Sequence, residues 1–230
     1  LLPLGASLIY VFGMLMMKRA TTHGIGLWRI TFIANWVMGL LTFTLWSLGG
    51  RGAPPGDWWQ PLLCGLTFVT GQICTYLAID GGDVSLATPV LGAKVLLVAF
   101  FSVLLLAGPV PLRWWIAAAL SSGAIVLFSR GGSGRGSHRH PGITVLCAAA
   151  AACLYAATDV LVQKWTPAWG VGRFLPLMFG MVAVYSFAFV PFFSAPLRAL
   201  PREAWRWVLA GATLLTVQNT MMAATLGVFG

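Results

Sequence analysis

The chain alternates long apolar runs with short polar segments. Eight of these runs are long enough to cross about 30 Å of hydrocarbon at about 1.5 Å per residue. They cover residues 1–17, 27–48, 58–79, 84–107, 112–129, 142–163, 174–194 and 205–228. Within a bilayer each run must pair its own backbone polar groups, so each is predicted to be a helix. The pattern therefore predicts an all-α polytopic membrane protein with eight helices in this chain.

One stretch of the chain occurs twice. Residues 57–82 align without a gap with residues 203–228, which lie 146 positions later, and eight of the 26 aligned positions are identical. Both copies carry a glutamine in mid-helix, Gln72 and Gln218. The first segment aligns more weakly with the sixth through Tyr10 and Tyr155. These matches indicate an internal repeat in which the first three helices recur as the last three.

The spacing of the repeat makes one unit five helices long. Because five is odd, the two copies are predicted to cross the membrane in opposite directions, and such inverted repeats place a shared site near the midplane in many secondary transporters. We expect a first repeat over 1–130, a linker over 131–141, and three of the five helices of a second repeat over 142–230. The complete protein is then expected to have ten helices, with two beyond the end of this sequence.

Composition and charge narrow the class of protein. The chain has 59% hydrophobic residues, 8% charged residues and a mean hydropathy of +0.87. This composition predicts a protein that is embedded in a lipid bilayer. The net charge of +9 is dispersed over short loops, which disfavours nucleic-acid binding. The four cysteines lie inside apolar runs without a CxxC pair or a histidine cluster, so neither a disulfide framework nor a metal site is expected, and no cofactor is implied.

Several stretches resemble the EamA-type transporters of the drug/metabolite transporter superfamily. They are Lys18 and Arg19 followed by Arg29, the run DVSLATPVLGAKVLLVAFFSVLLL, and the run LRWWIAAALSSGAIVLFSR. The resemblance covers nearly the whole chain and implies ten helices in two inverted five-helix repeats. Members of that family often carry a glutamate just after the fourth helix, where this chain has Ala107 and Gly108.

The orientation in the membrane is left open. Nine of the 14 basic residues fall in the loops on one side: Lys18, Arg19, Arg29, Arg130, Arg135, Arg139, Arg198, Arg202 and Arg206. The positive-inside rule places these loops in the cytoplasm and the N-terminus outside. The resemblance implies instead that both termini are cytoplasmic.

Polar side chains inside the predicted helices are the candidate site residues. Gln72 and Gln218 either join neighbouring helices through amide hydrogen bonds or face a shared substrate cavity, and Tyr10 is added to the candidate set. Asp159 either lies partly hydrated beside a snorkelling Lys164 or carries a proton. We hypothesise that Lys94, Gln72, Gln218, Tyr10 and Asp159 contribute to a substrate site.

Lys94 is the most informative of these residues. It lies eleven residues after Asp83, which places it about 16 Å into the predicted fourth helix and near the midplane. A charge there is costly, so it either pairs with an aspartate such as Asp159, is neutralised, or meets an anionic group of a substrate. Pro89, which cannot donate a helical hydrogen bond, is expected to break this helix locally.

Three classes of function are compatible with these patterns. A secondary transporter of a small metabolite, anionic or zwitterionic, agrees with the inverted repeat and the intramembrane polar residues. An integral-membrane enzyme would need paired acids, a nucleophile with a base, or a Cys/His cluster, and we find none, so the chain is not expected to be an enzyme. A channel or scaffold is the third class. We expect a multi-pass protein of the cell (plasma or inner) membrane, with proton coupling left open.

Overall fold

Helices account for almost all of the ordered architecture. The computed structural model describes residues 2–50, 55–80, 90–106, 111–130 and 141–229, and within these ranges there is no strand. The α-helices are α1 (Leu2–Thr21), α2 (Leu27–Thr42), α3 (Trp59–Asp80), α5 (Lys94–Leu106), α6 (Leu112–Arg130), α7 (Pro141–Trp169), α8 (Val171–Tyr185) and α9 (Arg202–Phe229). Short 3₁₀ helices are η1 (Phe43–Leu48), η2 (Pro55–Asp57), η3 (Ser186–Phe192) and η4 (Leu197–Ala199). The chain is an all-α polytopic membrane protein, as the hydropathy pattern predicts.

Four helical stretches are long and apolar enough to span a membrane by length and composition. They are Leu27–Leu48, Trp59–Ile79, Gly142–Trp169 and Val171–Phe192. Shorter apolar helices cover Val90–Leu106 and Trp115–Ala124. The other predicted spans coincide with helices of the structure, and their crossing of the bilayer stays a prediction.

The chain is divided into two compact units. One contains Leu1–Leu66 together with Trp165–Gly230, and the other contains Thr67–Lys164. We call them the terminal unit and the central unit. The helices α3 and α7 run from one unit into the other, and each unit draws helices from both of the expected repeats.

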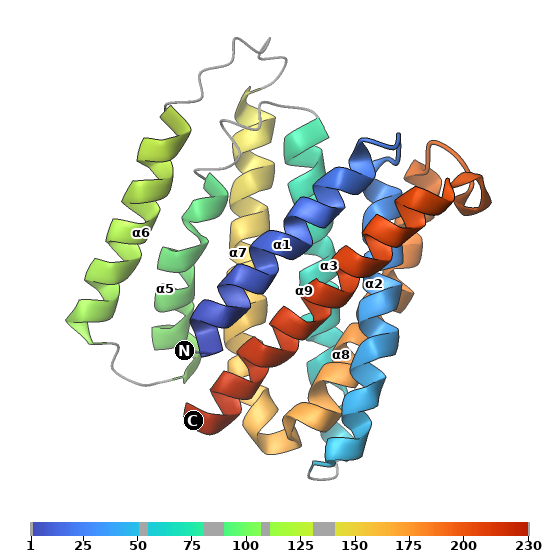
Figure 1. Cartoon of the computed structure of the whole chain (residues 1–230). Coiled ribbons are helices and arrows are strands. Elements are labelled where there is room, and N and C mark those ends of the chain that lie inside the picture. The colour runs from blue at the N-terminus through green and yellow to red at the C-terminus, as the bar shows by residue number, and fades with distance from the viewer. Residues whose placement is uncertain (1, 51–54, 81–89, 107–110, 131–140, 230) are drawn as a thin grey trace. The chain divides into compact units, whose positions relative to one another are not determined.

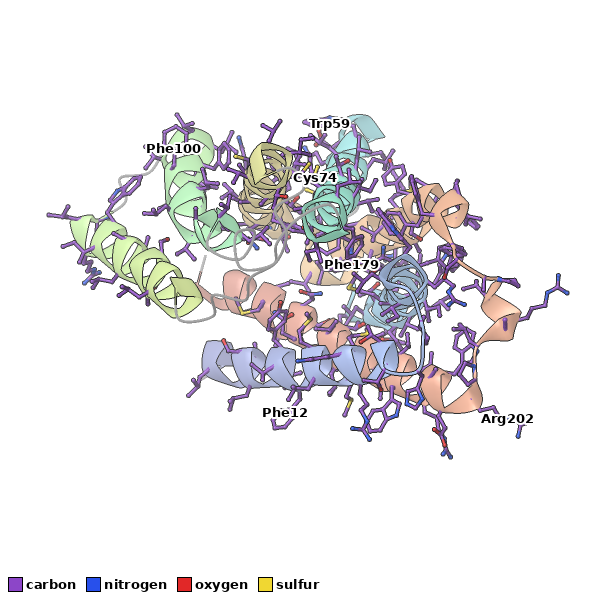
Figure 2. The ribbon with its side chains drawn as sticks, turned by 90° about the horizontal axis from the view of Figure 1, so that it is seen from above. Phe12, Trp59, Cys74, Phe100, Phe179 and Arg202 are labelled. Atoms are coloured by element: carbon purple, nitrogen blue, oxygen red, sulfur yellow. The ribbon has the colours of Figure 1, made fainter. Side chains whose placement is uncertain are left out.

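In the terminal unit, α1 and α9 lie side by side and antiparallel (Figure 1, blue and red). A Cβ atom added to Gly211 would lie 3.0 Å from the Gly13 carbonyl oxygen, which shows how closely the two backbones approach. Nearer one end, the Arg19 guanidinium lies 5.8 Å from the centre of the Trp207 ring. The opposite face of α1 is exposed: Phe12 points away from α9 in Figure 2 and is 58% exposed.

The helices α2 and α8 also pack against each other in this unit. A Cβ atom on Gly39 would lie 3.0 Å from the carbonyl oxygen of Phe179, which Figure 2 labels. Trp28, at the start of α2, stacks on Phe192 at 4.8 Å between ring centres. Gly172, at the start of α8, approaches the carbonyl oxygen of Leu45 in η1, which follows the far end of α2. The start of each helix thus lies beside the segment that follows the end of the other, so α2 and α8 run antiparallel.

Both of these helices end in a 3₁₀ stretch, which the hydropathy pattern did not predict. The α-helical parts stop at Thr42 and Tyr185, and η1 and η3 continue the apolar runs. Thr42 donates to the Met38 carbonyl at 2.8 Å, and Ser186 donates to the Ala183 carbonyl at 2.6 Å. Such bonds back to the preceding turn commonly accompany a tightened or bent helix.

In the central unit, α3 and α7 are antiparallel neighbours. Thr67 and Thr158 join them by a hydrogen bond of 2.7 Å between their hydroxyls. Nearer the end of α3, Ala78 and Ala148 form a buried contact on which Val90, Leu91 and Cys147 pack. Cys74 lies on the side of α3 that faces α7 (Figure 2). The helix α6 is tied to the segment before α5 by Ser122, which donates to the Gly92 carbonyl at 3.3 Å.

Most predicted helix bounds agree with the structure to within a few residues. When η1 and η3 are counted with α2 and α8, the largest difference at a described helix end is in α7. This helix continues to Trp169 rather than ending near 163, and it stops where Gly170 adopts a φ of 81°. The segment expected to form one helix over 84–107 is interrupted at Ala93. Residues 131–140 of the linker expected over 131–141 lie outside the described residues, as do Asp83, Pro89, Ala107 and Gly108, and Pro141 begins α7.

Candidate functional site

An ion pair joins α5 to α7 in the central unit. The Lys94 Nζ lies 2.7 Å from the Asp159 Oδ2, at charge-assisted hydrogen-bond distance. The Lys94 side chain is 35% exposed and the Asp159 side chain is 51% exposed. The pair that the sequence offered as one account of Lys94 therefore forms, but its carboxylate is half exposed rather than buried. Both charged groups retain surface for a ligand.

Tyr155 extends this cluster toward α3. Its ring centre lies 5.5 Å from the Lys94 Nζ, within the range of a cation–π interaction. Its hydroxyl lies 3.4 Å from the hydroxyl of Thr75, which also donates to the Gly71 carbonyl at 2.9 Å. We call Lys94, Asp159, Tyr155 and Thr75 the polar cluster. It brings together side chains from α3, α5 and α7.

Helical spacing explains why these side chains converge. Tyr155 and Asp159 are four residues apart and so share one face of α7. On α3, Gly71 and Thr75 share a face by the same spacing. A Cβ atom on Gly71 would lie 3.0 Å from the Tyr155 ring, so the absence of a side chain there lets the ring lie against α3. Phe68 packs edge-on against the same ring at 5.7 Å between centres.

The position of Lys94 depends on the interruption of its helix. Val90, Leu91 and Gly92 are helical, Ala93 forms a turn in which its N–H donates to the Val90 carbonyl, and α5 begins at Lys94. Lys94 is therefore the first residue of α5, whereas the sequence predicted a position about 16 Å into a longer helix with a local break at Pro89. The N-terminus of a helix carries the positive end of the helix dipole, which disfavours an ammonium there. The Asp159 carboxylate therefore compensates for two positive charges, the Lys94 ammonium and the N-terminus of α5.

Of the accounts of Asp159 that the sequence left open, the structure shows the ion pair with Lys94. Another account placed a partly hydrated Asp159 beside Lys164, late in its helix. Because α7 continues to Trp169, Asp159 lies ten residues, or about 15 Å, before the end of this helix. Its carboxylate pairs with Lys94 on a neighbouring helix, and no ion pair with Lys164 occurs among the described residues.

The remaining predicted site residues are distributed over both units. Gln72 is partly buried on α3 in the central unit, three residues before Thr75. Gln218 is partly buried on α9, and Tyr10 on α1 is 48% exposed, both in the terminal unit. The structure therefore brings Lys94 and Asp159 together, and the convergence of Gln72, Gln218 and Tyr10 stays a prediction.

Sequence reasoning did not select Tyr155 or Thr75. Tyr155 entered only as the repeat partner of Tyr10, and Thr75 is one of several threonines on apolar helices. The spacing of four residues between Tyr155 and Asp159 is the signal that could have identified the tyrosine. Within the parts of the chain that the structure describes, no group of three or more His, Cys, Asp or Glu side chains could hold a metal ion.

Comparison with known proteins gives the family. The model of the EamA-like transporter family matches residues 1–130, which is more than half of the chain. The search among curated proteins gave no match. The match to the family model agrees with the apolar helices of the fold. It also agrees with a transporter, rather than an enzyme, as the general class of the protein. The chain belongs to the EamA-like transporter family, within the drug/metabolite transporter superfamily.

Proposed function

We propose that this protein is a secondary-active transporter of a small metabolite in the cell (plasma or inner) membrane, and that the polar cluster is part of its substrate site. The observation that carries the proposal is the 2.7 Å ion pair of Lys94 and Asp159 between two apolar helices, with both partners partly exposed. Lys94 provides an ammonium for a carboxylate of the substrate. Asp159 provides a carboxylate for a cationic group.

The energetic cost of the pair supports a functional role. A charged side chain on a membrane helix is costly to insert, by up to about 2.5–3.5 kcal/mol at the centre of the helix on insertion scales. An ion pair whose partners are partly exposed contributes only about 0–1 kcal/mol to stability. Folding alone therefore gives little reason to keep both charges on α5 and α7. A ligand that uses both charges does give such a reason.

The charge balance of the pair favours a zwitterionic substrate. The pair is neutral, so a singly charged anion that takes Lys94 leaves Asp159 without its partner, and a cation that takes Asp159 leaves Lys94 without one. A molecule with a carboxylate and an ammonium replaces each partner of the pair with a group of the same charge. We therefore propose a zwitterion, with neutral amino acids as the simplest class. The Tyr155 ring adds a second contact for a cationic group.

The arrangement of the terminal unit supports an inverted repeat as the scaffold. The helices α2 and α8 occupy equivalent positions in the two proposed repeats, over 1–130 and 142–230, and they run antiparallel as inversion requires. Both end in a 3₁₀ stretch. In transporters with inverted repeats, alternating access arises when one repeat rocks against the other. We propose the same mechanism here, with Gln72 and Gln218 at symmetry-related positions.

The proposal can be tested by competition in proteoliposomes that contain the purified protein. Uptake of labelled neutral amino acids, beginning with serine, is measured against unlabelled serine, glycerate and ethanolamine. The last two carry only one of the two charged groups of serine. The zwitterion should compete at least about tenfold better than either, because an ion-pair partner left alone is strongly unfavourable. Equal competition by glycerate or ethanolamine would contradict a zwitterionic substrate.

A further inference from the structure

A buried arginine at the start of α2 has no acidic partner among the residues that the structure describes. Arg29 is 5% exposed and lies in the first turn of α2 in the terminal unit. One of its terminal nitrogens donates to the Gly24 carbonyl at 3.3 Å, and its Nε is buried without a hydrogen-bond partner. Within the described ranges, neither ion pair of the chain involves Arg29. A buried, unpaired charge of this kind is costly unless an anion compensates it.

The surroundings of Arg29 add positive potential. The helix α2 has Gly26 at its N-cap, without a capping side chain, and has no acidic residue in its first turn. The positive end of the α2 dipole is therefore not balanced by a local carboxylate. Lys18 and Arg19 occupy the last turn of α1 next to it in sequence. Glu203 is 74% exposed and faces His23 at 3.9 Å rather than Arg29.

A helix N-terminus that meets a guanidinium is a favourable place for a phosphate. Backbone N–H groups at the start of a helix and a bidentate arginine are both suited to phosphate oxygens. Ser194 lies beside the N-cap, because a Cβ atom on Gly26 would be 3.5 Å from its hydroxyl oxygen. We propose that Arg29 and the N-terminus of α2 form a binding site for a phosphate-bearing anion, separate from the polar cluster.

The depth of Arg29 indicates where such an anion would come from. The stretch Leu27–Leu48 is long and apolar enough to span a membrane, and Arg29 is its third residue. It therefore lies about 3 Å from one end of the span by helical rise, at the level of lipid headgroups. The headgroup phosphate of an anionic lipid and free inorganic phosphate share the required chemistry. Separate arms of the experiment distinguish them.

The test measures the thermal unfolding midpoint of the purified chain in maltoside micelles, which contain no phosphate. Three additions are compared: dioleoyl-phosphatidylglycerol, dioleoylglycerol with the same acyl chains but no phosphate, and inorganic phosphate. The wild-type midpoint should rise by about 2–4 °C or more with phosphatidylglycerol and should not rise with dioleoylglycerol. A rise with inorganic phosphate alone assigns the site to free phosphate. No rise with either phosphate source overturns the proposal.

The Arg29→Met variant separates ligand binding from a structural role. Without phosphate its midpoint should equal or exceed that of the wild type, because the unpaired charge is gone. With phosphatidylglycerol it should fall below the wild type, since the rise is lost. Arg202→Met, at an exposed arginine that begins α9, should keep the rise.

A wild-type-sized rise for Arg29→Met overturns the proposal. If that rise comes with a midpoint below that of the wild type by the same amount in both conditions, the role of Arg29 is to hold the Gly24 carbonyl. If this variant does not fold, Arg29→Lys serves in its place, because a lysine keeps the charge but loses the planar fork of donors. A reduced rise supports the site, and an unchanged rise overturns it.

Discussion

At the scale of single residues, the sequence predicted the two charged members of the polar cluster but not the other two. Lys94 and Asp159 are conspicuous in the sequence because each interrupts an apolar helix. The sequence also named Asp159 as one partner that Lys94 could have. It could not decide between this pair and the Asp159–Lys164 alternative, because that choice depends on where α7 ends and on the interruption before α5. Tyr155 and Thr75 were missed because tyrosine and threonine are common on membrane helices, where they usually pack or bond to the backbone.

The contact of Tyr155 with Thr75 gives a prediction at this scale. We expect Tyr155→Phe and Thr75→Val each to raise the KM for uptake about threefold, because each loses one interhelical hydrogen bond, worth on average about 0.6 kcal/mol. The two changes remove the same bond, so the double variant should be no worse than either single variant. KM is measured by initial-rate uptake in proteoliposomes.

Thr67→Val is the matched control for this experiment. It removes the hydroxyl pair of Thr67 and Thr158 from the same α3–α7 interface without touching the polar cluster, so its KM should stay at the wild-type value. Additive effects of Tyr155→Phe and Thr75→Val would show that the two hydroxyls act independently.

At the scale of elements, hydropathy predicts which segments are helical but not how each helix is turned about its axis. In a bilayer both the lipid-facing and the protein-facing sides are apolar, so the contrast that orients a surface helix of a soluble protein is missing. Small residues carry this information instead, as at the close approach of Gly13 to Gly211 and of Gly39 to Phe179. The 3₁₀ ends of α2 and α8 were not predicted because they preserve the apolar run and change only the local winding.

Gly172 gives a prediction for the contact between α8 and the end of α2. A Cβ atom there would lie 2.5 Å from the Leu45 carbonyl oxygen and 2.6 Å from that of Gly49. Both are backbone atoms, so we expect Gly172→Ala to destabilise the fold by about 1–3 kcal/mol through overpacking. Unfolding in detergent measures the change.

Gly123→Ala on α6 provides the comparison, because a Cβ atom on Gly123 meets nothing within 4 Å. The higher helix propensity of alanine should make this variant neutral or up to about 1 kcal/mol more stable. If Gly172→Ala is as stable as the wild type, α8 does not approach η1 as closely as described.

At the scale of the whole molecule, the architecture of two inverted five-helix repeats stays a prediction from the sequence. The match covers residues 1–130, which is the span that the repeat spacing assigns to the first five-helix unit. The antiparallel course of α2 and α8 is what two inverted units would produce. The packing of α1 on α9 and of α2 on α8 within the terminal unit could not be predicted from local sequence, because it depends on contacts between the two expected repeats rather than within one of them.

Inversion predicts that equivalent loops of the two repeats face opposite sides of the membrane. Thr22 and Ala168 are equivalent by the repeat spacing of 146 residues. We therefore place Thr22→Cys and Ala168→Cys, both at exposed positions, in a background without the four native cysteines. A membrane-impermeant maleimide applied to oriented vesicles should label one position from outside and the other only after permeabilisation. Labelling of both positions from the same side would rule out an inverted arrangement of these loops.

The most direct test of the central claim is uptake by the reconstituted protein with and without an imposed proton gradient. We expect the wild type to accumulate labelled zwitterionic substrate, and a gradient-dependent rate would make Asp159 the candidate proton carrier. Lys94→Met should abolish uptake while the protein remains folded. Lys164→Met, five residues beyond Asp159 on α7, should retain it. Unchanged uptake by folded Lys94→Met of every substrate that the wild type transports would contradict a transport site at the Lys94–Asp159 pair.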